Sequence, residues 1–402
     1  MSVLPRSAAP TAVPGAPAPP AEGAVRALVL ATLGFALSCW AWALLSPLGP
    51  VIVARGTLPE ASLMVALPVL VGSLGRIPVG ALTDRLGGRV MFPAVSLAAV
   101  VPVLFLGLVG QDSAVGLLLG AVALGIAGTS FAIGIPYVNS WFPAGWRGLA
   151  TGIFGASMGG TAISALTTVS LVGAVGEEAP FLLVAAVLVL YALIALRWMP
   201  TSPTWSPSPG GAASRCAAAA RLPITWQASY LYAVSFGGYV AFSVSLPTLL
   251  TTWYDLGSAA ASLWMGAFVL VAVLVRPLGG VLSDRFGSRA TLAVSYLTLL
   301  PGALLLAVHP PLWGPGSAAL AAIAVGAGLG AGAVFALVAQ VTPPDRVGAV
   351  TGLVGAAGGL GGFLPPLLLA ASLERTGSYS GALLLLGAAC LAALAITRVI
   401  RR

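Results

Sequence analysis

Apolar stretches, each long enough to cross a lipid bilayer as a helix, recur along the whole chain and are separated by short polar segments. A membrane-spanning helix needs roughly 20 predominantly apolar residues, and the pattern predicts twelve such helices. The predicted helices are residues 25–53, 60–82, 91–109, 114–142, 149–172, 180–199, 226–254, 259–282, 290–308, 317–341, 347–372 and 381–400.

Two polar segments divide this pattern. Residues 1–22 are rich in Pro and Ala and predict a disordered tail, and residues 200–225 are rich in Pro, Ser and Gly and predict a linker. The expected domains are therefore a six-helix bundle over 23–199 and a second six-helix bundle over 226–402.

Composition agrees with a membrane protein. With 59% hydrophobic and 7% charged residues and a mean hydropathy of +1.04, the chain has too little polar surface to cover a soluble globule of 402 residues. The sequence therefore predicts an all-α polytopic membrane protein. Cys39, Cys216 and Cys390 lie far apart without ligand-like neighbours, so we expect neither a disulfide framework nor a metal site, and no cofactor.

The charge pattern predicts the orientation in the membrane. The net charge of +8 comes from 18 basic residues, all arginine, which are scattered through short loops and do not form a nucleic-acid groove. Two of them, Arg55 and Arg375, fall on one side of the membrane and two, Arg76 and Arg276, fall within helices, so the remaining fourteen share the side of the N-terminus. Because short cytoplasmic loops are enriched in basic residues, we expect both termini to be cytoplasmic, in the inner (cytoplasmic) membrane of the cell.

An internal duplication organises the chain. RIPVGALTDRLGGR, residues 76–89, recurs as RPLGGVLSDRFGSR, residues 276–289, with seven of 14 positions identical and a displacement of 200 positions. The same displacement relates the glycine-rich segments that begin at Thr151 and Thr351. The two halves are therefore expected to be pseudo-symmetric copies of one architecture.

Each copy carries an arginine in apolar sequence. Arg76 precedes Asp84 by eight residues, roughly 12 Å in a helix, which puts it well inside the hydrocarbon if the charged turn marks the membrane surface. An arginine there costs about 2.5–3.5 kcal/mol, yet Arg276 repeats it in the second half. The arrangement favours a buried anion site between the halves; the alternative is that each side chain extends to the headgroups.

The repeated motif G-x-L-[TS]-D-R-x-G-x-R resembles the loop motif of the major facilitator superfamily. That resemblance implies twelve helices in two pseudo-symmetric six-helix bundles, with Asp84 and Asp284 held at helix ends against arginines of neighbouring helices. The resemblance implies that the two turns form a conformational latch, whose residues are Asp84, Arg85, Arg89, Asp284, Arg285 and Arg289. The alternative is a solvated turn in which only the glycines matter.

Three segments, residues 125–143, 151–164 and 351–366, resemble helices four, five and eleven of the nitrate/nitrite porter family. The resemblance implies that Arg76 and Arg276 hold the anion, that Tyr232 contacts it, and that Phe131 and Phe236 form walls of the site. Close packing of glycine-rich helices and ordinary core packing of the aromatic residues are the alternatives.

One position departs from that family, which has an asparagine in helix five where this chain has Met158. The polar residues nearest to it in the expected helices are Ser157, Thr161 and Asn139, any of which could instead bond its own helix. The further candidate substrate-binding positions are the glycines Gly159, Gly358 and Gly359.

The predicted function is transport of a small oxyanion, nitrate or nitrite, by a monomer that alternates its access to the two sides. Cyanate, formate and oxalate remain open as substrates, as do a proton-coupled multidrug exporter and a transporter-like sensor. The residue types and motifs of the sequence argue against an enzyme, since His309 is the single histidine and no paired acids or phosphate-binding loop is present. All ten acidic residues fall in the tail, in loops or at helix ends, which favours anion exchange over proton coupling.

Overall fold

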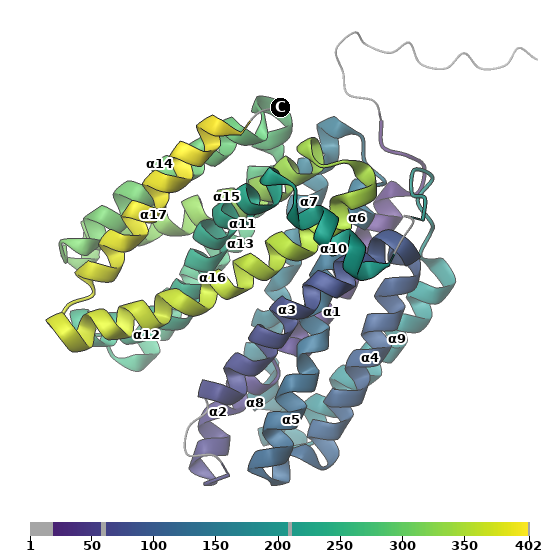
Figure 1. Cartoon of the computed structure of the whole chain (residues 1–402). Coiled ribbons are helices and arrows are strands. Elements are labelled where there is room, and N and C mark those ends of the chain that lie inside the picture. Colours follow the sequence, from purple (N-terminus) through teal and green to yellow (C-terminus); the bar gives the residue numbers. More distant parts are fainter. Residues whose placement is uncertain (1–18, 58–61, 208–210, 401–402) are drawn as a thin grey trace, which may run out of the picture.

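The structure, a computed structural model, describes residues 19–57, 62–207 and 211–400 (Figure 1). The first half contains α1 (Ala24–Trp42), α2 (Leu45–Ala54), α3 (Ser62–Leu86), α4 (Gly88–Leu108), α5 (Ala114–Leu124), α6 (Phe131–Asn139), α7 (Arg147–Ala156), α8 (Gly160–Val175) and α9 (Ala179–Trp198). The second half contains α11 (Pro223–Tyr232), α12 (Gly238–Tyr254), α13 (Ser258–Phe286), α14 (Ser288–Ala307), α15 (Ser317–Val341), α16 (Val347–Thr376) and α17 (Ser380–Val399).

Every predicted membrane helix coincides with helical structure in the described residues. Within the described residues, ten spans are long and apolar enough to cross a membrane. The pair Pro223–Ser243 and Ser245–Tyr254, which bends by 59°, is an eleventh if the pair is counted as one span. The remaining predicted stretch is α16, a helix of 30 residues. The prediction of an all-α polytopic membrane protein is confirmed. Most of the tail predicted at 1–22 lies outside the described residues.

The segment predicted as a plain linker contains a helix that the sequence analysis missed, α10 (Ala212–Ala220), whose alanine run has high helix propensity. The helix docks through Arg215, which is buried and donates from Nε and Nη2 to the carbonyl of Ala81 in α3, at 3.0 and 2.7 Å. The thiol of Cys216 donates to the carbonyl of Ile77 at 3.6 Å, and burial raises the pKa of this thiol. In Figure 1, α10 lies across α3 and α16, which belong to different halves.

The duplicated motif forms the same turn twice. Gly87, between α3 and α4, has φ 76°, and Gly287, between α13 and α14, has φ 89°. A side chain is strained in that region of backbone conformation, so a glycine is required at each turn. We call the side of the molecule that carries these two turns the seal face.

The two halves meet near the seal face through glycines. A Cβ atom on Gly80 of α3 would collide with the carbonyl of Gly348 in α16, and one on Gly280 of α13 would collide with the carbonyl of Gly148 in α7. The two contacts are related by the displacement of 200 positions found in the sequence. In Figure 1 the halves meet at this face and diverge toward the opposite end.

Candidate functional site

Arg76 and Arg276 lie in the interface between the halves, 3% and 2% exposed. Each donates from Nη1 to a carbonyl of the opposite half: Arg76 to Gly355 at 2.9 Å and Arg276 to Gly155 at 3.0 Å. The two acceptors are again 200 positions apart. The arginines are therefore buried in the protein and do not extend to the headgroups, which removes the alternative interpretation of the sequence.

Irregular backbone lies next to both arginines. Gly128, whose carbonyl accepts a hydrogen bond from Arg76 Nε at 3.1 Å, belongs to the 3₁₀ stretch Gly125–Ser130. Gly155, which accepts from Arg276, lies in the last turn of α7, two residues before the 3₁₀ stretch Ser157–Gly159. Departures from regular α-helix leave carbonyls available to other donors, and here the arginines use them.

The symmetry breaks at the guanidinium groups. Nε and Nη2 of Arg276 are buried and have no hydrogen-bond partner among residues 19–57, 62–207 and 211–400, whereas Nε of Arg76 donates to Gly128. A buried cation with unused N–H groups is strongly unfavourable unless an anion accepts from it. Arg276 is therefore the side chain best prepared to hold an anion.

Aromatic rings enclose the arginines. The ring of Tyr232 is parallel to that of Phe236 at a centroid distance of 4.8 Å and to that of Phe131 at 6.3 Å. Arg76 lies over the Phe131 ring at 5.2 Å, and Arg276 over the Phe236 ring at 5.3 Å. Cation–π contacts of this kind stabilise a guanidinium group without using its N–H donors. The structure thus brings Tyr232, Phe131 and Phe236 together with both arginines.

Sequence reasoning missed three residues of this cluster. The ring centroid of Tyr239 lies 5.0 Å from Cζ of Arg276. Tyr239 follows Phe236 by three positions, a helical spacing that could have placed it beside Phe236 in the prediction. Phe335 of α15 packs edge-on against Tyr232 at 4.7 Å, and Cys39 of α1 lies within the electrostatic range of both arginines. Neither of the latter two carries a sequence signal, because each reaches the site from a different helix.

The glycine-rich candidates have different surroundings. A Cβ atom on Gly358 would collide with the Tyr232 ring and one on Gly359 with Ser73, whereas a Cβ on Gly159 would meet open space. Gly358 is thus required for the position of the Tyr232 ring. Gly159 has no such packing role.

Ser157 and Met158 follow the carbonyl that Arg276 uses, and both side chains are buried. The Ser157 hydroxyl has no partner within the described part of the chain, so it remains a candidate anion donor. Thr161 bonds its own helix, donating to the Met158 carbonyl at 2.9 Å.

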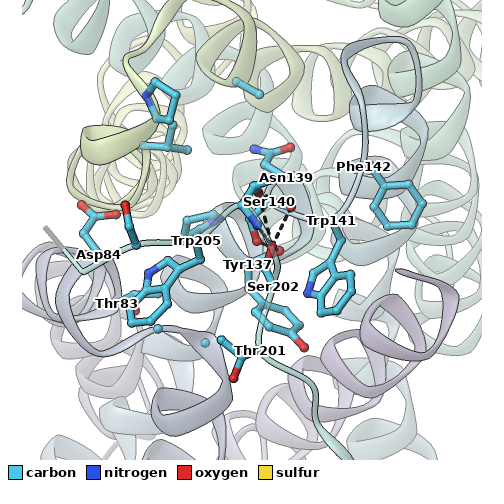
Figure 2. Close-up of a pocket in the computed structure, with 18 of the residues that line it drawn as sticks. Thr83, Asp84, Tyr137, Asn139, Ser140, Trp141, Phe142, Thr201, Ser202 and Trp205 are labelled. Carbon is cyan, nitrogen blue, oxygen red and sulfur yellow. Dashed lines mark hydrogen bonds between the residues drawn. The ribbon is translucent and has the colours of Figure 1, made fainter. Parts of the chain in front are cut away.

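Asn139 is not brought to the arginines. It ends α6, eight residues and roughly 12 Å beyond Phe131, and lines a cavity of about 1060 Å³ at the seal face (Figure 2). The cavity is separate from the aromatic cluster, and the amide atoms of Asn139 beside it are themselves buried.

The aspartates of the duplicated motif join the two halves. Asp84 of α3 accepts from the backbone N–H groups of Gly348 and Ala349, and Asp284 of α13 accepts from those of Gly148 and Leu149, all at 2.8 Å. These N–H groups open α16 and α7, where the helix dipole favours a carboxylate. The sequence analysis expected arginines beside both carboxylates but did not foresee that backbone N–H groups would be their hydrogen-bond partners. The cations in electrostatic range, Arg215 for Asp84 and Arg147 for Asp284, act at longer distance.

The arginines of the motif bind within their own half or face solvent. Arg89 donates to Thr201 Oγ1 at 3.3 Å, and Arg289 donates to the carbonyl of Ile400 at 2.8 Å, so each ties the seal-face turn to the end of its bundle. Arg285 lies over the exposed ring of Phe286 at 5.2 Å, and Arg85 is exposed.

Two pseudo-symmetric helical halves, a buried cationic centre between them and a seal at one face define a secondary transporter that works by alternating access. Comparison with known proteins agrees. The model of the Major Facilitator Superfamily matches residues 31–366 and 228–402. Similar solved structures include the human organic anion transporter MFSD10 (TM-score 0.77, 18% identity, 93% of this chain and 99% of that one) and the transporter FucP (TM-score 0.75, 16% identity, 94% and 100%).

Curated relatives are closer in sequence. The "Probable nitrate/nitrite transporter NarK2" of Mycobacterium tuberculosis is 44% identical, covering 94% of this chain and 96% of its own. The "Nitrite extrusion protein" of Bacillus subtilis is 33% identical, covering 80% of each chain. The chain belongs to the nitrate/nitrite porter family of the Major Facilitator Superfamily.

Proposed function

We propose that this protein transports nitrate and nitrite across the cell membrane, exchanging one anion for another. The observation that carries the proposal is the Arg276 guanidinium, 2% exposed, with Nε and Nη2 unpartnered in the described residues. The names of the curated relatives support the choice of anion.

The chemistry of the site suits a planar oxyanion. A guanidinium group presents parallel N–H donors to which two oxygens of nitrate or nitrite can bind at once. Tyr232, Phe131 and Phe236 would fit flat against such an anion and exclude water. Arg76 would supply the second positive charge, and Ser157 a neutral donor.

The bonds at the seal face support an assignment of the structure to one state of the transport cycle. The aspartate bonds between the halves lie at the seal face, and the positive-inside pattern of arginines supports a cytoplasmic location for that face and for both termini. This structure then represents the outward-facing side of the cycle. Rocking the bundles 23–199 and 226–402 would break these bonds and open the cytoplasmic side.

The fixed positive charges of Arg76 and Arg276 support an exchange mechanism. Two buried arginines lie in the interface, within electrostatic range of each other. The acidic residues of the helices that carry them, Asp84 and Asp284, are used in the seal. An empty site would move net positive charge through the membrane interior, which is unfavourable, so reorientation requires a bound anion. Since one chain supplies both halves of the site, a monomer suffices.

The test is uptake of labelled nitrate into liposomes that contain the purified chain and unlabelled nitrite. We expect rapid uptake that external nitrite inhibits and that cyanate, formate and oxalate do not. Stronger inhibition by one of those three anions would identify that anion, and not nitrite or nitrate, as the preferred substrate. Transport of cationic drugs without nitrate uptake would contradict the proposal altogether.

A further inference from the structure

The two halves meet along two seams that the displacement of 200 positions relates to each other. In the first seam α3 packs against α16, and in the second seam α13 packs against α7. The seams are equivalent at the seal face, because Asp84 binds the first N–H groups of α16 in one and Asp284 those of α7 in the other. They differ toward the opposite end of the molecule, which we call the outer end.

The difference between the seams begins at the level of the arginines. A Cβ atom on Gly355 in the first seam would lie 3.2 Å from Cδ of Arg76, which is closer than an ordinary van der Waals contact. A Cβ atom on the equivalent Gly155 in the second seam would lie 3.9 Å from Cδ of Arg276. The first seam is therefore the tighter of the two at this level, although each arginine donates to the glycine carbonyl opposite it.

The difference is larger one helical turn farther out. In the first seam Gly359 is buried, and a Cβ atom on it would collide with Ser73 of α3, which is 1% exposed. The equivalent glycine of the second seam, Gly159, is half-buried, and a Cβ atom on it would have nothing within 4 Å. The first seam thus stays closed for one turn, about 5.4 Å, beyond the level at which the second seam opens.

The helices explain why the second seam opens earlier. In the first seam α16 runs without a break for 30 residues. Its counterpart α7 ends at Ala156 and is followed by the 3₁₀ stretch Ser157–Gly159 and then by α8. A 3₁₀ stretch inside a helix often marks a hinge, and beyond it α8 packs against α1 of its own half, where a Cβ atom on Gly160 would collide with the Ala36 carbonyl.

The linker adds to the first seam near the seal face. The helix α10 lies across α3 and α16 (Figure 1), and its buried Arg215 donates twice to the Ala81 carbonyl of α3. In the second seam Arg147 reaches the Ala339 carbonyl of the other half at 3.4 Å, which is long for a hydrogen bond. The first seam is therefore held by α10 near the seal face and by the contact of Ser73 with Gly359 beyond the arginines.

We propose that the halves rock unsymmetrically, with a pivot close to the first seam, so that each end of the molecule opens mainly along the second seam. Displacement grows with distance from a pivot. The larger movement therefore falls on Asp284 and Arg276, and the smaller movement on Asp84 and Arg76. An anion from the outer end reaches the site beside Arg276, whose Nε and Nη2 have no partner among the described residues. The inference rests on the proposed function for the alternation of access and for the anion.

The test measures, in lipid bilayers without nitrate, how far each seam opens at the outer end. Cys216, which is half-buried, is replaced by serine so that spin labels attach to introduced cysteines, since Cys39 and Cys390 are buried. The labelled pairs are exposed positions across each seam, Leu63 with Leu368 for the first and Leu263 with Leu166 for the second.

The distances are compared with and without Asp84→Asn and Asp284→Asn together, which weaken the seal equally in both seams and favour the state open at the seal face. As the outer end closes, we expect the distance across the second seam to fall by at least about twice as much as the distance across the first.

A pair of alanine substitutions tests the contact that keeps the first seam closed. Gly359→Ala places a methyl group against Ser73 and should lengthen the distance across the first seam, and adding Ser73→Gly should restore it. Gly159→Ala is the matched control, because its methyl group has open space and should leave both distances unchanged.

The outcomes separate the unsymmetrical pivot from the proposed function. Equal changes across the two seams, a larger change across the first seam, or no change across either would overturn the pivot. An unchanged distance in Gly359→Ala would do the same, because the first seam would then not be closed at Ser73. These distances are measured without a transported anion, so nitrate–nitrite exchange is tested separately by the uptake experiment.

Discussion

Replacing Arg276 with lysine tests the unsymmetrical role of the two arginines. The substitution keeps the positive charge but removes Nε and Nη2, the two buried N–H groups without a described partner. The ammonium group of lysine can replace at most the bond from Nη1 to the Gly155 carbonyl, now 3.0 Å. The planar fork that would bind two oxygens of the anion is lost.

The expected loss follows from those two donors. A hydrogen bond to a charged group contributes about 1.5–3 kcal/mol, so removing two of them weakens anion binding by roughly 3–6 kcal/mol. That change corresponds to an increase in Kd of about 10²- to 10⁴-fold. The same substitution at Arg76 should weaken binding less, because Nε and Nη1 of Arg76 already donate to protein carbonyls.

The assay is titration calorimetry of the purified protein with nitrate. Arg285→Lys is the matched control, since Arg285 lies on the same helix over the exposed Phe286 ring and should bind nitrate like the wild-type chain. Circular dichroism and thermal unfolding would establish that each variant is folded. A Kd for Arg276→Lys within threefold of the wild-type value would refute the role assigned to the guanidinium fork.

Three further substitutions test the seal, all followed by the distance between spin labels on α4 and α14 and by exchange turnover. Asp84→Asn replaces one of two accepting oxygens by a donor that faces an N–H group. We therefore expect the equilibrium to shift by about 1–3 kcal/mol toward the state that is open at the seal face. An unchanged distance distribution and turnover would count against a role of Asp84 in the seal. Arg215→Ala removes both bonds from Arg215 to the Ala81 carbonyl. The substitution should shift the equilibrium in the same direction by about 1 kcal/mol. A shift toward the sealed state would be inconsistent with a role of α10 in the seal. Gly280→Ala places a methyl group against the Gly148 carbonyl and should open the seal most; full retention of the sealed state would show that this glycine contact is dispensable.

The duplication made the interface between the halves predictable. Once Arg76 and Arg276 are known to be equivalent, contacts of one with Gly355 and of the other with Gly155 follow from the same displacement. The length of the apolar runs likewise predicted the membrane helices, because a spanning segment must satisfy its own backbone in the bilayer.

The residues that break the symmetry were not predictable. Nothing in the repeated motif indicates that Nε of Arg76 finds the Gly128 carbonyl while Nε of Arg276 finds no partner among the described residues. That difference depends on a 3₁₀ stretch in one half, a backbone feature that residue patterns do not determine. The partners of Asp84 were missed for a related reason, since backbone N–H groups carry no sequence signature.

The location of Asn139 could have been predicted. Its spacing of eight residues from Phe131 on one helix separates the two by roughly 12 Å, too far for both to contact one small anion. The helix α10 was also indicated by its alanine run, but the prolines and serines around it suggested a flexible linker.

Uptake of labelled nitrate into liposomes that contain no exchangeable anion, under an inward proton gradient, decides whether a bound anion is required for the site to reorient. Two fixed guanidinium charges, with Asp84 and Asp284 used in the seal, predict no accumulation until nitrite or nitrate is loaded inside. Robust accumulation driven by the proton gradient alone would contradict obligatory exchange.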